Sequence, residues 1–229
     1  MTSLMSRWAG HAKHDEETFV AKPACALGWG SGLLALVVVA AVLIPAGPLD
    51  IDSRWAELMQ DIQAPWLRQV ALIFNALGRG WSLVTIGAIG LVLVVGRRWV
   101  ALVAFACTEA VTPLLVAVIK ALVDRPRPVD ELIHPHGSSF PSGHAAYAAA
   151  TTTALVLLFT KPDRHRRAWV PPSVLLTAGM SWSRTYLQVH WLSDVVAGAT
   201  LGLAVALIGF ATIQIITVRR TINRGIPVR

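Results

Sequence analysis

The sequence predicts an all-α integral membrane protein, a polytopic bundle of six transmembrane helices with one short interfacial helical segment. Two observations lead to this fold class. The 229 residues are 55% apolar and only 14% charged, whereas about a quarter of the residues of an average soluble domain are charged. The apolar residues are also gathered in long runs of about 20, the length that a helix needs to cross a hydrocarbon core ~30 Å thick.

The expected spans follow these runs in chain order. Residues 24–49, 80–96 and 195–218 carry no charged side chain, and 99–119 carry only Glu109. Two further apolar runs flank a basic loop at 161–167. We therefore expect spans at residues 27–47, 81–96, 99–120, 143–160, 168–187 and 193–216.

Residues 50–78 are expected to form the interfacial segment. Its first part, from Asp52, has the pattern of a capped amphipathic helix start. The stretch 64–77 is apolar but contains Arg68 and is only fourteen residues long, which suits an interfacial or re-entrant helix better than a span. A seventh span at this place is the alternative.

The distribution of positive charge predicts the topology. The domain plan is a polar tail at 1–22, a transmembrane domain at 23–218 and a basic tail at 219–229. With both termini in the cytoplasm, thirteen of the twenty Lys and Arg residues lie on the inner side, as the positive-inside rule requires. The net charge of +7 therefore reflects topology, and no nucleic-acid partner is expected. The seven outer cations are Arg54, Arg68, Arg79, Lys120, Arg125, Arg127 and Arg184.

Three polar stretches border the apolar runs, and the first follows the third span. Lys120 closes that span, where its ammonium can reach the interface along its aliphatic chain. Arg127-Pro128 comes after it in extended backbone, because a proline disfavours helix at the preceding residue. Two cations at this place suit a phosphate group. The alternative is an interfacial lysine followed by a basic loop.

The second stretch, Pro141-Ser142-Gly143-His144, opens the fourth span. Proline and serine are favoured at a helix start, and the unpaired N–H groups of a first turn form an anion site. Gly143 lets the backbone approach a ligand closely. His144 lies beside this anion site, where it can give a proton to a leaving oxygen. The alternative is an ordinary N-terminal cap.

The third stretch joins Ser183-Arg184 to His190 and Asp194. On a helix, His190 and Asp194 would share one face, because they are four residues apart. A carboxylate bound to one ring nitrogen fixes the tautomer and leaves the other nitrogen as a nucleophile. The alternative is a structural hydrogen bond at a helix end. Two spans separate His144 from Ser183, so all three stretches are predicted to share one membrane face.

The three stretches resemble the signature of the phosphatidic acid phosphatase type 2 (PAP2) superfamily, in its membrane branch. Eleven positions match in order over residues 120–194. They are Lys120 with six residues before Arg127-Pro128, then Pro141-Ser142-Gly143-His144, then Ser183-Arg184 with five residues before His190 and three more before Asp194.

This resemblance implies a role for each matched residue. His190 would attack phosphorus and form a phosphohistidine, Asp194 would orient it, and His144 would protonate the leaving group. The resemblance further implies that no metal or other cofactor is needed. The implied phosphate-binding residues are Lys120, Arg127, Ser142, Gly143 and Arg184.

The predicted function is a phosphatase for membrane lipid phosphates or diphosphates at the extracytoplasmic side, with the bilayer and its lipid substrate as partners. The family's candidate substrates are polyprenyl diphosphates, phosphatidylglycerophosphate and phosphatidic acid. A phosphotransferase that uses the same phosphohistidine is the alternative. A transporter is less favoured, because the ionisable residues gather at one face and only Glu109 lies deep in a span.

Two interpretations remain open for each of three further residues, Glu109, His134 and His136. Glu109 lies eleven residues before Lys120, on nearly the same helix face, and either binds a polar group in the bundle or makes a structural hydrogen bond. His134 and His136 in the outer loop are either metal ligands or solvated side chains.

Overall fold

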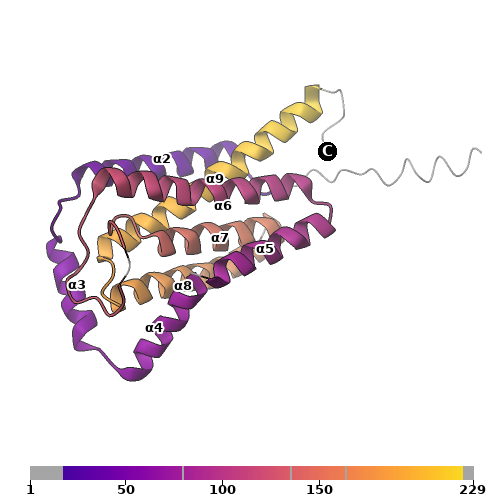
Figure 1. Ribbon diagram of the computed structural model, residues 1–229. Coiled ribbons are helices and arrows are strands. Elements are labelled where there is room, and N and C mark those ends of the chain that lie inside the picture. Colours follow the sequence, from indigo (N-terminus) through magenta and orange to yellow (C-terminus); the bar gives the residue numbers. More distant parts are fainter. Residues whose placement is uncertain (1–17, 79, 135, 163, 224–229) are drawn as a thin grey trace, which may run out of the picture.

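The computed structural model describes residues 18–78, 80–134, 136–162 and 164–223, and within them every regular element is a helix. Most of the helices run side by side, while α3 lies across one end of the bundle (Figure 1). The prediction of an all-α fold is confirmed for these residues. The helices are α2 (Pro23–Leu43), α3 (Asp50–Asp61), α4 (Pro65–Gly78), α5 (Gly80–Val95), α6 (Trp99–Val123), α7 (Gly143–Phe159), α8 (Arg164–Tyr186) and α9 (Leu192–Asn223).

Three of these helices are long and apolar enough to cross a membrane by themselves: α2, α6 and α9. A fourth span would result if α4 and α5 cross as one unit that is bent by 48°. Helix α7 is apolar but has only 17 residues, about 25 Å of helix, which is shorter than the hydrocarbon core. The six-span count is therefore not confirmed and stays a prediction.

The outer surface of the bundle is strongly apolar. Val42 on α2, Leu83 on α5 and Leu175 on α8 each expose at least 70% of their surface. A soluble monomer rarely carries such continuous apolar area. These side chains suit contact with lipid, and the chain is an integral membrane protein.

The segment expected at the interface consists of two helices. Helix α3 begins with Asp52 in its first turn, and Oδ2 of this residue accepts a hydrogen bond from the Leu49 N–H at 3.1 Å. Such a bond caps a helix start. Helix α4 packs against α8 and leads into α5, so the second half of the segment belongs to the bundle.

Helix α9 is the centre of the bundle and packs against α2, α6, α7 and α8. Its contact with α7 is close because glycines face it. A Cβ on Gly198 would overlap the carbonyl oxygen of Ser142, and one on Gly202 would overlap that of Ala146. Small residues spaced by four let two membrane helices approach to backbone contact. This approach brings the first turn of α7 against the first turn of α9.

At the other end of the bundle, residues 18–22 pack on α9. The amide oxygen of Gln214 accepts hydrogen bonds from the N–H groups of Phe19 and Val20, both at 2.9 Å, and Phe19 is buried edge-on against Phe210. The remaining residues of the predicted N-terminal tail, 1–17, lie outside the described residues, as do Arg79 and 224–229. Helix α9 continues to Asn223, past the expected start of the basic tail at 219.

Candidate functional site

All three polar stretches lie at one end of the bundle, where four helix ends converge (Figure 1). Lys120 is in the last turn of α6, and Ser142 immediately precedes α7. Arg184 is in the last turn of α8, and Asp194 is in the first turn of α9. Segments more than 70 residues apart in the sequence thus supply one cluster of side chains.

His190 and Asp194 contact each other, but not along one helix as the spacing suggested. His190 lies in the turn between α8 and α9, before the first residue of α9. Its Nδ1 is 3.5 Å from Oδ2 of Asp194, a long contact. The same Oδ2 accepts a hydrogen bond from the Trp191 N–H at 2.9 Å. Asp194 therefore caps its own helix, and this brings its carboxylate to the imidazole.

The other ring nitrogen of His190 faces a cation. Nε2 lies 3.4 Å from Nη1 of Arg127, and a guanidinium can only donate. Burial lowers the pKa of His190 to about 4, an effect that the nearby Asp194 opposes only in part. The imidazole is therefore neutral at pH 7, with a lone pair on Nε2 and its proton on the side of Asp194.

A helix-ending turn at the end of α8 aims His190 into the cluster. The N–H of Val189 bonds to the carbonyl of Arg184 at 3.1 Å, and that of Gln188 to Thr185 at 3.0 Å. This is the Schellman pattern, whose turning residue adopts the left-handed region. Gln188 does so with φ 55°, although glycine is the usual residue there. Its side-chain amide donates to the Ala56 carbonyl of α3, which ties the turn to the rest of the fold.

Lys120 and Arg127 lie together beside His190. Both donate to the carbonyl oxygen of Ser138, Arg127 through Nη2 at 3.2 Å. Arg127 also donates to the carbonyls of Gly137 at 2.9 Å and Val189 at 2.6 Å. Burial lowers the pKa of Arg127, yet a guanidinium stays charged at any physiological pH. Two adjacent cations make this a favourable place for a phosphate dianion.

Ser142 and Gly143 form the start of α7 against α9. The N–H of Ser142 bonds to the carbonyl of Asp194 at 2.9 Å. The Ser142 hydroxyl is buried, and among the described residues it has no hydrogen-bond partner. A buried hydroxyl without a partner costs free energy, so it is poised for a ligand oxygen. A Cβ on Gly143 would meet only Val116, at 3.5 Å, so protein packing alone does not require glycine there.

His144 and Arg184 both contact α4. A Cβ on Gly78 would overlap the His144 ring, so the last residue of α4 lies directly against the imidazole. Nη1 of Arg184 donates to Oδ1 of Asn75 at 2.6 Å, and Arg184 is almost fully buried. Helix α4 thus holds two of the site's side chains, although the sequence analysis gave it no part in the site.

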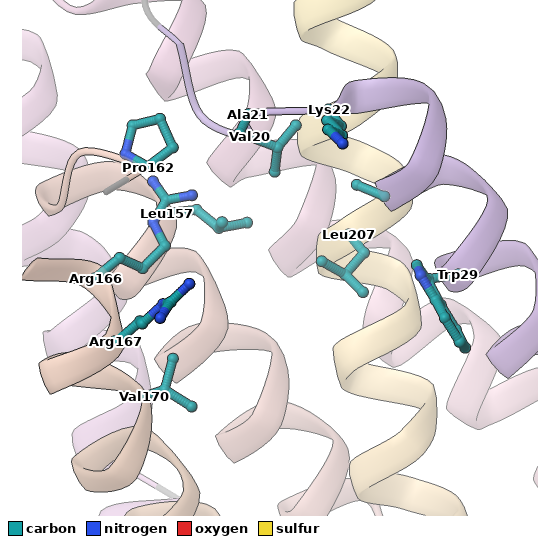
Figure 2. A pocket seen from close by; sticks show the side chains of 11 residues that line it. Val20, Ala21, Lys22, Trp29, Leu157, Pro162, Arg166, Arg167, Val170 and Leu207 are labelled. Carbon is teal, nitrogen blue, oxygen red and sulfur yellow. The ribbon is translucent and has the colours of Figure 1, made fainter. Parts of the chain in front are cut away.

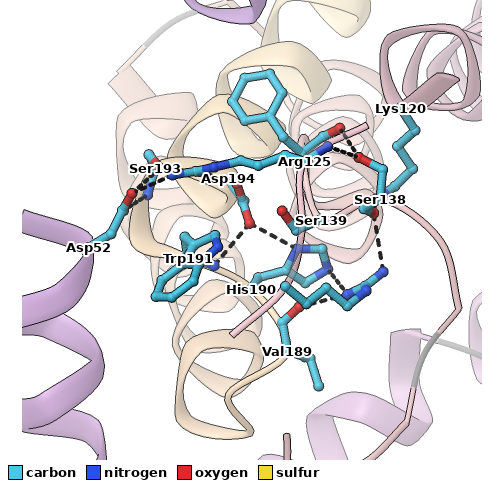
Figure 3. A network of polar contacts seen from close by, with 12 residues as sticks. Asp52, Lys120, Arg125, Ser138, Ser139, Val189, His190, Trp191, Ser193 and Asp194 are labelled. Atoms are coloured by element: carbon cyan, nitrogen blue, oxygen red, sulfur yellow. Dashed lines mark hydrogen bonds and ion pairs between the residues drawn. The ribbon is translucent and has the colours of Figure 1, made fainter. Parts of the chain in front are cut away.

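Three residues of the cluster were missed by sequence reasoning: Asp52, Arg125 and Ser193. Arg125 lies between two carboxylates and donates to Asp194 Oδ1 at 2.6 Å and to Asp52 Oδ2 at 2.8 Å (Figure 3). Asp52 also accepts from the Ser193 N–H and hydroxyl, both at 2.8 Å. The side chains of Asp52, Arg125 and Asp194 are fully buried. We call Asp52, Arg125 and Ser193 the Asp194 clamp.

The one signal for the clamp was indirect. A carboxylate buried beside a membrane span needs a cationic partner, and the sequence offered Arg125 next to the matched Arg127. It gave no means of choosing among the outer cations, and Asp52 had a sufficient explanation as a helix cap.

The three remaining candidates lie away from the cluster or outside its chemistry. Oε1 of Glu109 accepts from the Thr151 hydroxyl of α7 at 3.0 Å, a bond that joins α6 to α7. His134 is exposed, with Nδ1 3.8 Å from Glu131, and the His136 carbonyl accepts from Arg127 at 3.3 Å. Within the described residues, no group of three or more His, Cys, Asp or Glu side chains is placed to hold a metal ion.

Comparison with known proteins identifies the family of this chain. A sequence model of the PAP2 superfamily matches residues 99–217. Phosphatidylglycerophosphatase B of Bacillus subtilis is 28% identical over 182 residues, which are 74% of this chain and 87% of that protein. Decaprenylphosphoryl-5-phosphoribose phosphatase of Mycobacterium tuberculosis is 36% identical over 134 residues, 56% of this chain and 69% of that protein.

A solved structure is similar over most of the fold. The crystal structure of a transmembrane PAP2 type phosphatidylglycerolphosphate phosphatase from Bacillus subtilis superimposes with a TM-score of 0.69 at 25% identity. The match covers 83% of this chain and 96% of that one. The residues matched by the family's sequence model, 99–217, include α6, α7, α8 and most of α9, whereas α3 and α4 precede that range.

Proposed function

Since this chain belongs to the PAP2 superfamily, whose relatives here are phosphatases, we propose that it hydrolyses a membrane lipid phosphate or diphosphate through a phosphohistidine on His190. The observation that carries this proposal is the environment of one imidazole. One ring nitrogen of His190 faces the Asp194 carboxylate and the other faces the Arg127 guanidinium. A neutral imidazole held between a base and a phosphate-binding cation is prepared for attack on phosphorus.

In the first step, Nε2 of His190 attacks phosphorus and the bond from phosphorus to the lipid oxygen breaks. His144 gives its proton to that oxygen, which leaves as an alcohol or, from a diphosphate, as a lipid monophosphate. Asp194 stabilises the positive charge that develops on the ring of His190. In the second step, a water molecule gives a proton to His144 and attacks phosphorus, and the bond to Nε2 breaks. Inorganic phosphate is released.

The phosphoryl oxygens would be held by the cations and the first turn of α7. Lys120 and Arg127 lie beside His190, and the unpartnered Ser142 hydroxyl adds a donor. Arg184 and the Gly143 N–H complete the set that we assign. Phosphoryl transfer depends mainly on positioning and on charge stabilisation, so we expect the reaction to proceed without a metal ion.

The Asp194 clamp would act as a set of positioning residues. With Arg125 on Oδ1, and with Trp191 on Oδ2, the carboxylate cannot rotate away from His190. Supporting hydrogen bonds of this kind keep a catalytic group in its productive geometry.

The substrate class follows from the surroundings of the cluster. It lies at the end of apolar helices whose outer faces suit lipid, so a substrate can keep its tail in the bilayer. Polyprenyl diphosphate, phosphatidylglycerophosphate and phosphatidic acid are the candidates. We assign the cluster to the extracytoplasmic face and both termini to the cytoplasm, because thirteen of twenty Lys and Arg residues then lie inside. Transfer of the phosphoryl group to another lipid or a sugar is the alternative second step.

The test is release of inorganic phosphate by the full chain in lipid nanodiscs, with each candidate lipid and with EDTA present. We expect hydrolysis in EDTA, inhibition by vanadate, and a loss of about 10³-fold or more in His190→Ala. Acid-quenched wild type should carry a labelled phosphohistidine. Unchanged turnover in the His190 variant, or complete inhibition by EDTA, would contradict the proposal. Product that appears only when an alcohol acceptor is added would identify a phosphotransferase.

A further inference from the structure

A second basic site lies at the end of the bundle opposite to His190. A cavity of about 770 Å³ opens there between the starts of α2 and α8 and the middle of α9 (Figure 2). Its rim carries three cations, Lys22, Arg166 and Arg167. Arg166 and Arg167 are neighbours on α8, and the docking of residues 18–20 on Gln214 brings Lys22 to the same opening.

Two of the three cations at this cavity, Lys22 and Arg167, have no carboxylate partner among the described residues. No carboxylate is among the side chains that line it, within the part of the chain that the structure describes. Lys22 and Arg167 are exposed, and neither forms an ion pair with a described residue. Arg166 differs, since it donates to the carbonyls of Phe19 at 2.5 Å and Thr160 at 2.7 Å. Arg166 thus joins residue 19 to the end of α7 beside the cavity, while Lys22 and Arg167 are available to bind an anion.

Apart from these cations, the side chains that line the cavity are apolar. Leu157, Val170 and Leu207 line it, together with Trp29, which exposes 74% of its surface. Trp29 lies on α2, one of the candidate spans, so this wall continues into the lipid-facing surface. A tryptophan beside basic residues at the end of a span is typical of the membrane interface.

We propose that this cavity binds an anionic phospholipid, whose phosphate contacts Lys22 and Arg167 and whose acyl chain lies along Trp29 and Leu207. Lys22 precedes α2 and Trp29 lies in its second turn, so along this helix a cation is followed by an apolar side chain, as a charged head group is followed by an acyl chain in such a lipid. A soluble anion would gain nothing from the apolar wall. A zwitterionic lipid would bring its own cation to a rim that already holds three. The site is separate from the phosphatase cluster, so the two proposals can fail independently.

The experiment measures lipid binding to the full chain in detergent by native mass spectrometry, as dioleoyl phosphatidylglycerol or dioleoyl phosphatidylcholine is titrated. Vanadate is added throughout to occupy the His190 cluster. We expect one phosphatidylglycerol per chain, with at least tenfold preference over phosphatidylcholine. In the double variant Lys22→Gln/Arg167→Gln, the affinity for phosphatidylglycerol should fall about tenfold or more, because each cation contributes to contact with anionic lipid.

The matched control is Arg219→Gln/Arg220→Gln, which removes two exposed cations from the same end of the bundle but not from the cavity. This variant should keep the wild-type affinity to within about twofold. Equal losses in the two double variants would show diffuse attraction to the basic end and overturn the proposal. So would equal binding of the two lipids, or no stoichiometric lipid on the wild type. The thermal unfolding midpoint of each variant reports whether it is folded.

Discussion

The bundle carries a buried polar network at each end, and the two networks are built differently. At the end away from His190, the Gln214 amide pairs its oxygen with two backbone N–H groups and its nitrogen with the Val20 carbonyl at 3.0 Å. The bonds of Gln214 join residues 19 and 20 to α9 through uncharged groups. At the His190 end the network is charged, and the Ser142 hydroxyl has no partner among the described residues.

The difference distinguishes buried polar groups that stabilise the fold from buried polar groups that are available to bind a ligand. A buried amide whose hydrogen bonds are all made within the protein needs no further explanation. A buried hydroxyl that has no partner among the described residues, as at Ser142, is costly unless another molecule completes it. The predictions below test this difference, from the largest expected change in activity to the smallest.

The largest effect after loss of His190 is expected for Asp194→Asn. The amide cannot hold the proton-bearing side of the imidazole or stabilise its positive charge, so kcat should fall about 10³-fold. Phosphate release in nanodiscs measures this. Asp124→Asn is the matched control, because Asp124 is exposed and its φ of 42° is one that asparagine accepts. Comparable turnover in the two variants would mean that the charged network stabilises the fold and has no part in catalysis.

The Asp194 clamp should matter less than Asp194 itself. In Arg125→Lys an ammonium cannot span two carboxylates as a guanidinium does, and in Asp52→Asn one partner of Arg125 loses its charge. We expect kcat to fall about 10- to 100-fold in each, with KM changed less than about threefold. Arg54→Lys, at an exposed position on α3, should behave as wild type.

A purely structural clamp would give another pattern. It would lower the thermal unfolding midpoint of both variants and leave the kcat of the folded fraction unchanged. That result would give Asp52 and Arg125 a purely structural role, like that of Gln214.

Gly78→Ala tests the contact between α4 and His144. The added methyl group would overlap the imidazole, and a displacement of about 1 Å can cost up to 10²-fold in rate. We expect about a tenfold loss of kcat on a lipid phosphate. The loss should shrink with p-nitrophenyl phosphate, whose leaving group needs no proton. Gly87→Ala on α5, where a Cβ meets nothing within 4 Å, is the control. An equal loss on both substrates in the rate of phosphohistidine formation, measured in a single turnover, would contradict proton donation by His144.

The pH behaviour of His190 follows from its burial. Its pKa of about 4 is below the ordinary value near 6.5, so Nε2 should stay unprotonated when the pH falls from 7 to 5.5. Between these two pKa values the unfolded chain binds a proton and the folded one does not. This residue therefore makes the fold less stable as the pH falls through that window. Histidine ring signals in a nitrogen-15 NMR titration measure this pKa, and titration of His190 near 6.5 would contradict the buried, neutral imidazole.

The smallest effect on activity is expected for Gln214→Ala. It leaves two buried N–H groups without acceptors, and each unpaired group costs about 1–3 kcal/mol. The thermal unfolding midpoint should therefore fall by several degrees, while phosphate release stays within about twofold of wild type. A large loss of kcat in this variant at a temperature where it is folded would remove the distinction between the two ends.

The sequence predicted those site residues that are marked by their type and spacing, and it missed those whose only mark is a contact with a residue distant in the sequence. His190, Asp194 and Lys120 were found because their types and spacings are tied to phosphate chemistry. Asp52 and Arg125 were not, because a contact between residues 73 apart in the sequence has no local pattern. The role of α4 was hidden for the same reason, since Asn75 and Gly78 are ordinary residues at a helix end.

The elements were predicted better than their lengths. The apolar runs correctly indicated helices, because burial of backbone polar groups in lipid leaves little else. The count of spans did not follow, since a 17-residue helix such as α7 can be shielded by its neighbours and need not match the bilayer. Likewise, His190 and Asp194 were expected on one helix, but α9 starts between them.

By itself, the sequence determined that this chain is an apolar helical protein with three polar stretches suited to phosphate. Composition and residue spacing are local properties, and local properties can be read along a chain. Only the tertiary structure decided which buried charges meet. Gly198 and Gly202 admit α7 to the face of α9, and Arg125 joins Asp52 to Asp194. The tertiary structure also brought Lys22 to Arg167 at the opposite cavity, because the gathering of charges depends on neighbours in space.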